Sequence, residues 1–121
     1  MKENIVLRKS KAFALRIIKM YRWLSEEKHE YVLSKQCLRS GTSIGANIRE
    51  SINAQSKSDF VSKLSIALKE SDETQYWLEL LHESDYIDDE KLFLSIYDEN
   101  IELTRLLTSI IKSTKENTPK N

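Results

Sequence analysis

Apolar residues recur at helical spacing along four stretches of the chain. In the first, about residues 4–26, the large apolar side chains fall on one side of a helix: Phe13, Ile17, Met20, Tyr21 and Leu24. Residues three and four apart share one face of an α-helix, so this pattern predicts an amphipathic helix with one buried face.

The second stretch, about residues 31–53, carries two parallel lines. The apolar line is Leu33, Cys37, Gly41, Ile44 and Ile48, and a polar seam beside it is Gln36, Ser40, Ser43, Asn47 and Glu50. Inside a helix, Gly41 and Gly45 each cost about 1 kcal/mol relative to alanine. We interpret them as positions where a neighbouring backbone comes close, and a local break of the helix there is the alternative.

The third stretch ends near Glu83 and has N-cap candidates in residues 56–59. Its apolar line alternates in steps of four and three: Phe60, Leu64, Ala67, Ser71, Thr74, Leu78 and Leu81. A seven-residue repeat of this kind is typical of antiparallel bundles.

The fourth stretch, about residues 90–113, has Asp88 or Asp89 as its expected cap. Its apolar residues are Leu92, Phe93, Ile96, Tyr97, Ile101, Leu103, Leu107, Ile110 and Ile111. The chain holds two glycines and one proline, which disfavours a fold with many tight turns. We therefore predict an all-α, antiparallel up-down-up-down four-helix bundle over residues 1–113, with a disordered polar tail at 114–121.

The net charge is zero, but the two ends of the chain differ. Residues 1–49 hold eleven Lys and Arg against four Asp and Glu, which is +7, and residues 50–121 hold eight against fifteen, which is −7. This asymmetry favours either contact with a polyanion or contact between a basic face and an acidic face of another copy.

The cations of the first helix fall within one arc opposite its apolar face: Arg8, Lys9, Lys11, Arg16, Lys19 and Arg22. Three interpretations stay open. The face is simply solvated, or it docks on acidic residues of another copy such as Glu70, Asp72 and Glu73, or it binds a nucleic-acid backbone in a salt-sensitive way.

No pattern in the sequence predicts catalysis or a cofactor. Di-iron bundles need paired Glu-x-x-His motifs, and only Glu79 and His82 match once. Phosphate-binding loops and HExxH are missing from the sequence. The one cysteine, Cys37, lies on an apolar line and is expected to be an inert buried thiol. With no signal peptide and no stretch of about 20 apolar residues, we expect a cytoplasmic protein outside the membrane.

The polar seam, together with Ser71 and Thr74 at core positions, departs from a simple apolar bundle. Buried polar groups cost about 1–3 kcal/mol each unless they are hydrogen-bonded. Either these residues form a polar layer between helices that sets their register, or they line an assembly interface or a ligand groove.

The stretch QCLRSGTSIGANIRE at residues 36–50, then Phe60 and IALKESDET at 66–74, resembles the 23S rRNA intervening sequence proteins, once labelled S23 ribosomal proteins. Two positions depart from the family pattern, since Ser51 and Glu70 stand where glycine is expected. The matching positions are Gln36, Arg39, Ser40, Ser43, Asn47, Glu50, Ser71 and Thr74.

The resemblance implies an antiparallel bundle, a barrel-like homopentamer and kinship with the accessory variability protein of diversity-generating retroelements, which binds nucleic acid. The molecular activity of the family is largely unassigned. We therefore expect a non-enzymatic scaffold that assembles with itself, and as the alternative an accessory protein that binds nucleic acid through the basic face of its first helix.

Overall fold

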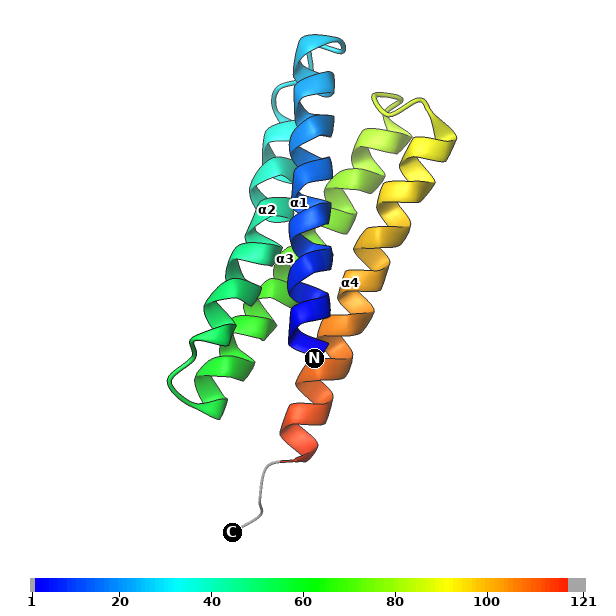
Figure 1. The fold of residues 1–121 in the computed structure, drawn as a ribbon. Coiled ribbons are helices and arrows are strands. Elements are labelled where there is room, and N and C mark those ends of the chain that lie inside the picture. Colours follow the sequence, from blue (N-terminus) through cyan, green and yellow to red (C-terminus); the bar gives the residue numbers. More distant parts are fainter. Residues whose placement is uncertain (1, 118–121) are drawn as a thin grey trace.

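The structure, a computed structural model, describes residues 2–117, with side chains from Ile5 onward. Its elements are four helices: α1 at Lys2–Glu26, α2 at Leu33–Ile52, α3 at Lys57–Glu83 and α4 at Glu90–Glu116 (Figure 1). No strand occurs between residues 2 and 117. The prediction of an all-α fold with four helices is confirmed.

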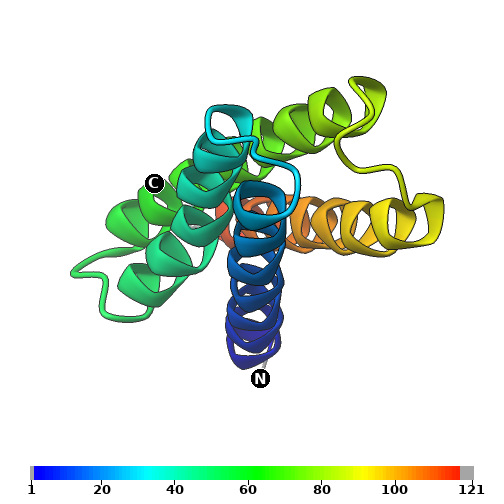
Figure 2. The same ribbon diagram turned by 90° about the horizontal axis from the view of Figure 1, so that it is seen from above.

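Each helix packs against its neighbours in the chain, and α4 returns to α1. Among these neighbours the α2–α3 contact is the most extensive and the α1–α4 contact the least, while no Cα atoms of α1 and α3 lie within 8 Å of each other. In Figure 1 the chain rises along α1, descends along α2, rises along α3 and descends along α4. The view from above shows α1 and α3 on opposite sides of the bundle (Figure 2).

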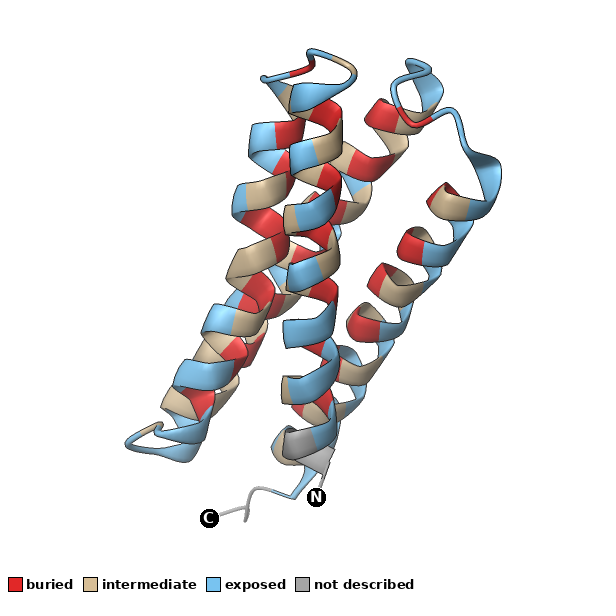
Figure 3. Cartoon of the chain, turned by 45° about the horizontal axis from the view of Figure 1, so that its top comes forward, coloured by how far each residue is buried: buried red, intermediate tan, exposed pale blue. Residues whose placement is uncertain are grey.

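The core forms where the predicted apolar lines meet. Buried positions run as stripes along the facing sides of the helices (Figure 3). On α3 the buried residues are Leu64, Ala67, Ser71, Thr74, Leu78 and Leu81, which are six of the seven positions of the predicted repeat. The seventh, Phe60, is partly buried and packs against the core.

The helices begin where hydrogen-bonding groups satisfy their first free N–H groups. Ser56 is the N-cap of α3, and its hydroxyl accepts from the Asp59 N–H at 3.0 Å. Asp89 is the N-cap of α4, where its carboxylate accepts from the Leu92 N–H at 3.1 Å. Both caps were among the predicted candidates.

The predicted ends of two helices differ from those observed. The second helix begins at Leu33 rather than near residue 31, because Glu30 folds back on its first turn. The last helix runs to Glu116, three residues beyond the predicted end, so 114–116 are helical. The Thr114 hydroxyl donates to the Ile110 carbonyl at 2.7 Å, and Lys115 suits the negative end of the helix dipole. The rest of the predicted disordered tail, 118–121, lies outside the described residues.

The two glycines of α2 lie where α1 approaches most closely. A Cβ atom on Gly41 would lie 3.0 Å from two side-chain carbons of Ile17, and one on Gly45 would lie 3.3 Å from the Ser10 hydroxyl oxygen. The α1 backbone thus comes close at Gly45, where the same Cβ atom would lie 3.5 Å from the Ser10 carbonyl oxygen, whereas at Gly41 the near atoms belong to a side chain. The helix continues unbroken through both glycines.

Candidate interaction surfaces

A layer of polar side chains crosses the middle of the bundle. The hydroxyl oxygens of Ser40 on α2 and Thr74 on α3 lie 2.8 Å apart, and those of Ser71 and Thr104 are also 2.8 Å apart. The Asn100 amide nitrogen donates to the Ser71 carbonyl and hydroxyl, both at 3.2 Å. This layer links α2, α3 and α4 through hydrogen bonds within the core.

The remaining predicted seam residues do not join this layer. Ser43 and Asn47 are half-buried, and both donate within their own helix. The Ser43 hydroxyl donates to the Arg39 carbonyl at 2.6 Å, and the Asn47 amide donates to the Ser43 carbonyl at 2.9 Å. Gln36 and Glu50 are exposed. The seam thus splits into one buried member, Ser40, and an outer strip that remains accessible.

Arg39, on the outer face of α2, bridges to α3. Its guanidinium pairs with Glu70 at 3.1 Å and also with Glu73. Two of the three acids predicted as a surface for another copy are therefore paired within the chain. Asp72, the third, is exposed and has no ion pair among the described residues.

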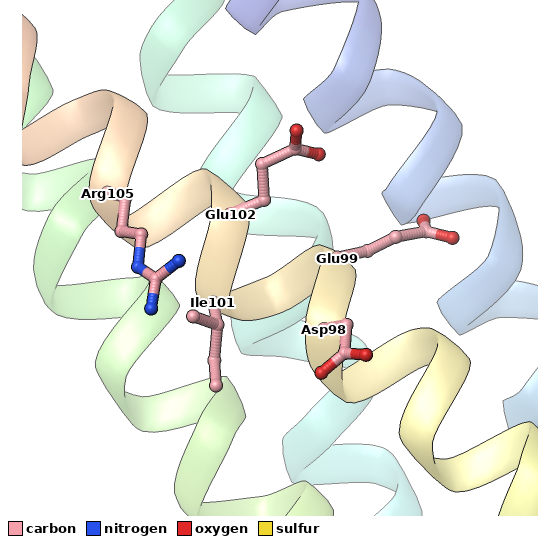
Figure 4. Close-up of a pocket in the computed structure, with 5 residues that line it drawn as sticks. All are labelled: Asp98, Glu99, Ile101, Glu102 and Arg105. Carbon is pink, nitrogen blue, oxygen red and sulfur yellow. The ribbon is translucent and has the colours of Figure 1, made fainter.

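Two cations of the basic face of α1 turn toward α4. Lys9 pairs with Glu102 at 3.1 Å, and Arg16 pairs with Glu99 while donating to the Ser95 hydroxyl at 3.0 Å. Figure 4 shows both acids reaching from α4 toward α1 beside a shallow depression lined by Asp98, Ile101 and Arg105. These pairs link α1 and α4, which share the least contact of the neighbouring helices.

The other four cations of α1 form an outward stripe with Leu15 at its centre: Arg8, Lys11, Lys19 and Arg22. All four are exposed, and none has an ion pair with a side chain that the structure describes. Leu15 is 59% exposed, the highest value for a large apolar side chain within the described part of any helix. We call these five residues the α1 stripe.

Part of the uneven charge of the chain is neutralised by ion pairs within the fold. Besides the four pairs made by Lys9, Arg16 and Arg39, Lys28 pairs with Asp88 at 2.9 Å, which lowers the pKa of Asp88. All five join a cation before residue 50 to an acid after it. Sequence reasoning weighed only external partners, because a charge sum does not show which helices are neighbours.

Sequence reasoning also missed several buried polar residues, among them Asn100 and Glu30. Asn100 has no exposed surface, and its place between Ile96 and Leu103 on the buried line of α4 was the available signal. Glu30 is 7% exposed, and its carboxylate accepts from the N–H groups of Val32, Leu33 and Ser34 at 2.7–3.0 Å. The Ser34 hydroxyl in turn donates to the Glu30 carbonyl at 2.8 Å.

Chemically reactive groups are sparse in the part of the chain that the structure describes. Burial raises the pKa of the Cys37 thiol to about 12, so the thiol stays protonated. His82 contacts Glu90 at 2.8 Å and stacks on Phe93, and no three His, Cys, Asp or Glu residues within 2–117 lie close enough to share a metal ion. No described helix is long and apolar enough to cross a membrane.

A groove between α1 and α2 borders the α1 stripe. Its lining is largely small or apolar, with Lys11 and Arg49 as its cations, and it includes Ala14, Gly45 and Ala46. The groove therefore extends the accessible basic surface from α1 onto α2.

Comparison with known proteins assigns the chain to a family. A crystal structure from Bacteroides thetaiotaomicron VPI-5482, of a protein with unknown function from the S23 ribosomal protein family, superposes with a TM-score of 0.90. The two are 55% identical over 93% of this chain and 99% of that one. No curated protein matches. The family model of the 23S rRNA-intervening sequence proteins matches residues 2–109, and the chain belongs to that family.

Proposed function

We propose that this protein is a non-enzymatic scaffold of the cytoplasm that assembles with copies of itself into a ring. The observation that carries the proposal is the α1 stripe, where Leu15 is exposed among four cations that have no ion pair with the described side chains. Outward positions in the middle of a surface helix are normally polar. An apolar side chain framed by charges suits a protein surface with an apolar centre and an acidic rim.

The reactive groups of the chain support the non-enzymatic part of the proposal. The only thiol is buried and protonated, and Glu79, half of the Glu-x-x-His match, accepts from the Tyr97 hydroxyl at 2.6 Å. The His82 side chain is held by Glu90 and Phe93 on α4. Glu79 and His82 therefore serve contacts between α3 and α4.

Light scattering coupled to size-exclusion chromatography tests self-assembly. At micromolar concentration and physiological salt we expect a single species, and the family resemblance implies a mass near five times the chain mass of 14.2 kDa. A series of salt and protein concentrations shows how strongly charge contributes, since exposed ion pairs weaken as salt is added. A monomer at every condition would overturn the proposal.

Nucleic-acid binding is the second candidate, and the same stripe favours it. Six cations were predicted for this role, but Lys9 and Arg16 are engaged by α4, which leaves four to meet phosphates. Each phosphate neutralised on duplex nucleic acid adds about 0.9 to the slope of log affinity against log salt. The kinship with the retroelement accessory protein, which would fit this candidate, stays a prediction.

Filter binding of rRNA fragments across a salt series tests the second candidate. The variant carrying Lys19→Gln and Arg22→Gln should bind more weakly and with a salt slope shallower by about 2. The matched control carries Lys91→Gln and Lys112→Gln, which remove two exposed cations from α4. Equal losses in both variants would indicate nonspecific attraction and reject a site on α1.

A further inference from the structure

A second outward stripe lies on α3, with Tyr76 at its centre. Tyr76 is 55% exposed, second only to Leu15 among large apolar side chains of the described helices. It lies between Asp72 and Glu83, which are both exposed and have no ion pair with the described residues. We call Asp72, Tyr76 and Glu83 the α3 stripe.

The two stripes have the same spacing and opposite charge. On α1, Leu15 follows Lys11 by four residues and precedes Arg22 by seven. On α3, Tyr76 follows Asp72 by four residues and precedes Glu83 by seven. At a rise of 1.5 Å per residue, Lys11 and Asp72 each lie about 6 Å along the helix from their apolar centre. Arg22 and Glu83 each lie about 10.5 Å from it on the other side. Two such helices laid side by side in the same direction bring Lys11 opposite Asp72 and Arg22 opposite Glu83.

The position of the two stripes in the fold prevents them from meeting within one molecule. The helices α1 and α3 lie on opposite sides of the bundle, and none of their Cα atoms come within 8 Å of each other (Figure 2). They run in the same direction (Figure 1). Two different surfaces on opposite sides of one protomer generate a head-to-tail contact, which forms a ring if the rotation from each protomer to the next closes.

We propose that the α1 stripe of one copy packs against the α3 stripe of the next copy. Leu15 then contacts Tyr76, while Lys11 pairs with Asp72 and Arg22 pairs with Glu83. This inference rests on the proposed self-assembly and names the surfaces that produce it. The apolar pair lies at the centre and the ion pairs shield it at both ends, an arrangement typical of protein interfaces.

The register places one like-charged pair at the end of the contact. Arg8 lies three residues before Lys11, and Lys69 lies three residues before Asp72, so these two exposed cations face each other. Like charges at a contact oppose association. The change Lys69→Glu should therefore strengthen the assembly, which is a result that only this register predicts.

Charge reversal in the full-length chain tests the pairing. One variant carries Lys11→Glu and Arg22→Glu, a second carries Asp72→Lys and Glu83→Lys, and a third carries all four changes. We expect each double variant to raise the concentration at which half the rings dissociate by about tenfold or more, which corresponds to about 1.4 kcal/mol. The fourfold variant should recover wild-type assembly, because its stripes are again complementary.

Controls separate this inference from the proposed function. Lys35→Glu with Lys112→Glu makes the same charge change on α2 and α4, and should leave assembly unchanged; circular dichroism checks that every variant is folded. If the wild type assembles but the double variants do so equally well, or the fourfold variant stays dissociated, the named surfaces are wrong and self-assembly stands. If the wild type is monomeric throughout, the proposed function itself fails.

Discussion

The side-chain hydroxyls of Ser40 and Thr74 meet 2.8 Å apart in the interface between α2 and α3, where neither residue has any exposed surface. Thr74 also donates to the Glu70 carbonyl at 2.7 Å, within its own helix. A hydroxyl pair tolerates fewer alternative alignments than an apolar contact, since a displaced helix breaks the bond between the two hydroxyls and leaves only the bonds within each helix. The pair therefore helps to set how α2 lies along α3.

A double-mutant cycle should detect this contact. We expect Ser40→Ala and Thr74→Val each to lower the free energy of unfolding by about 1 kcal/mol, with a coupling of about 0.5–1.5 kcal/mol between them. Urea unfolding at a fixed protein concentration measures the four species. Ser43→Ala serves as the control, because that hydroxyl bonds only its own helix and should cost less than about 0.5 kcal/mol. A coupling near zero would show that the two hydroxyls act independently.

The two glycines of α2 should respond differently to alanine. Either replacement gains about 1 kcal/mol of helix propensity. At Gly41 the new methyl group meets fully buried Ile17 at 3.0 Å, and crowding of a packed core costs about 1–3 kcal/mol. At Gly45 the nearest atom is the Ser10 hydroxyl oxygen at 3.3 Å, which needs only a small shift.

Thermal unfolding of the two variants checks this expectation. Gly41→Ala should lower the midpoint, whereas Gly45→Ala should leave it close to the wild-type value. Ala46→Gly, at an exposed position of the same helix, measures the effect of helix propensity alone and should lower the free energy of unfolding by about 1 kcal/mol. A rise in the midpoint for Gly41→Ala would mean that α1 can move away from α2 without lowering the stability of the fold.

Stability in acid should depend on Glu30. Burial alone would raise the pKa of this carboxyl, but the N–H groups of Ser34, Leu33 and Val32 donate to the carboxylate, and together they lower the pKa below its ordinary range. A carboxyl whose pKa is lower in the folded state stabilises the protein above its unfolded pKa, roughly 4.3 for Glu. That stabilisation is lost as the pH falls from about 4.3 toward the lowered folded value.

The measurement is urea unfolding at pH values from 3 to 7. Glu30→Gln should be less stable than the wild type at pH 7, and the difference should shrink as the pH falls below about 4.3. Glu27→Gln, an exposed neighbour in the same loop, is the matched control and should show no such convergence. A constant difference between wild type and Glu30→Gln at all pH values would contradict a role for the ionised carboxylate.

The pattern of apolar residues predicted the buried faces well because they depend on local spacing. The six buried positions of α3 and the caps at Ser56 and Asp89 follow from residues within one helix or its first turn. The role of Glu30 could not be predicted in this way, since it depends on the chain turning at His29, which has a positive φ of 56°. Glycine is the usual signal for such a turn, and the chain has none there.

The candidate surfaces were predictable only in part. The arc of six cations on the first helix followed from helical periodicity, and four of them are indeed exposed without a described ion pair. The pairing of Lys9 and Arg16 with acids of α4 depends on which helices are neighbours in the fold, and spacing within one helix does not show this. The division of the basic face into paired and unpaired cations is therefore a property of the fold.

Asn100 should be the most sensitive polar residue of the core. Its amide nitrogen donates twice to Ser71, while its side-chain oxygen has no hydrogen-bond partner among the described residues, although the residue is fully buried. Asn100→Asp removes both donations and places a carboxyl in the buried polar layer beside Ser71. At pH 7 the substitution should lower the free energy of unfolding by about 3 kcal/mol or more, because an unpaired charge is then buried.

The pH dependence of the same variant separates burial of charge from loss of hydrogen bonds. Burial raises the pKa of a carboxyl in the folded state, so the folded form of Asn100→Asp binds its proton more tightly than the unfolded chain. Its stability should therefore be greatest below the unfolded pKa of about 3.9 and fall as the pH rises above that value. Asn100→Leu removes the same donations and the unpaired oxygen without adding a charge, so it should cost less at pH 7 and vary little with pH. If both variants are equally stable at pH 7, water reaches the side chain at position 100 and the polar layer is not sealed within the bundle.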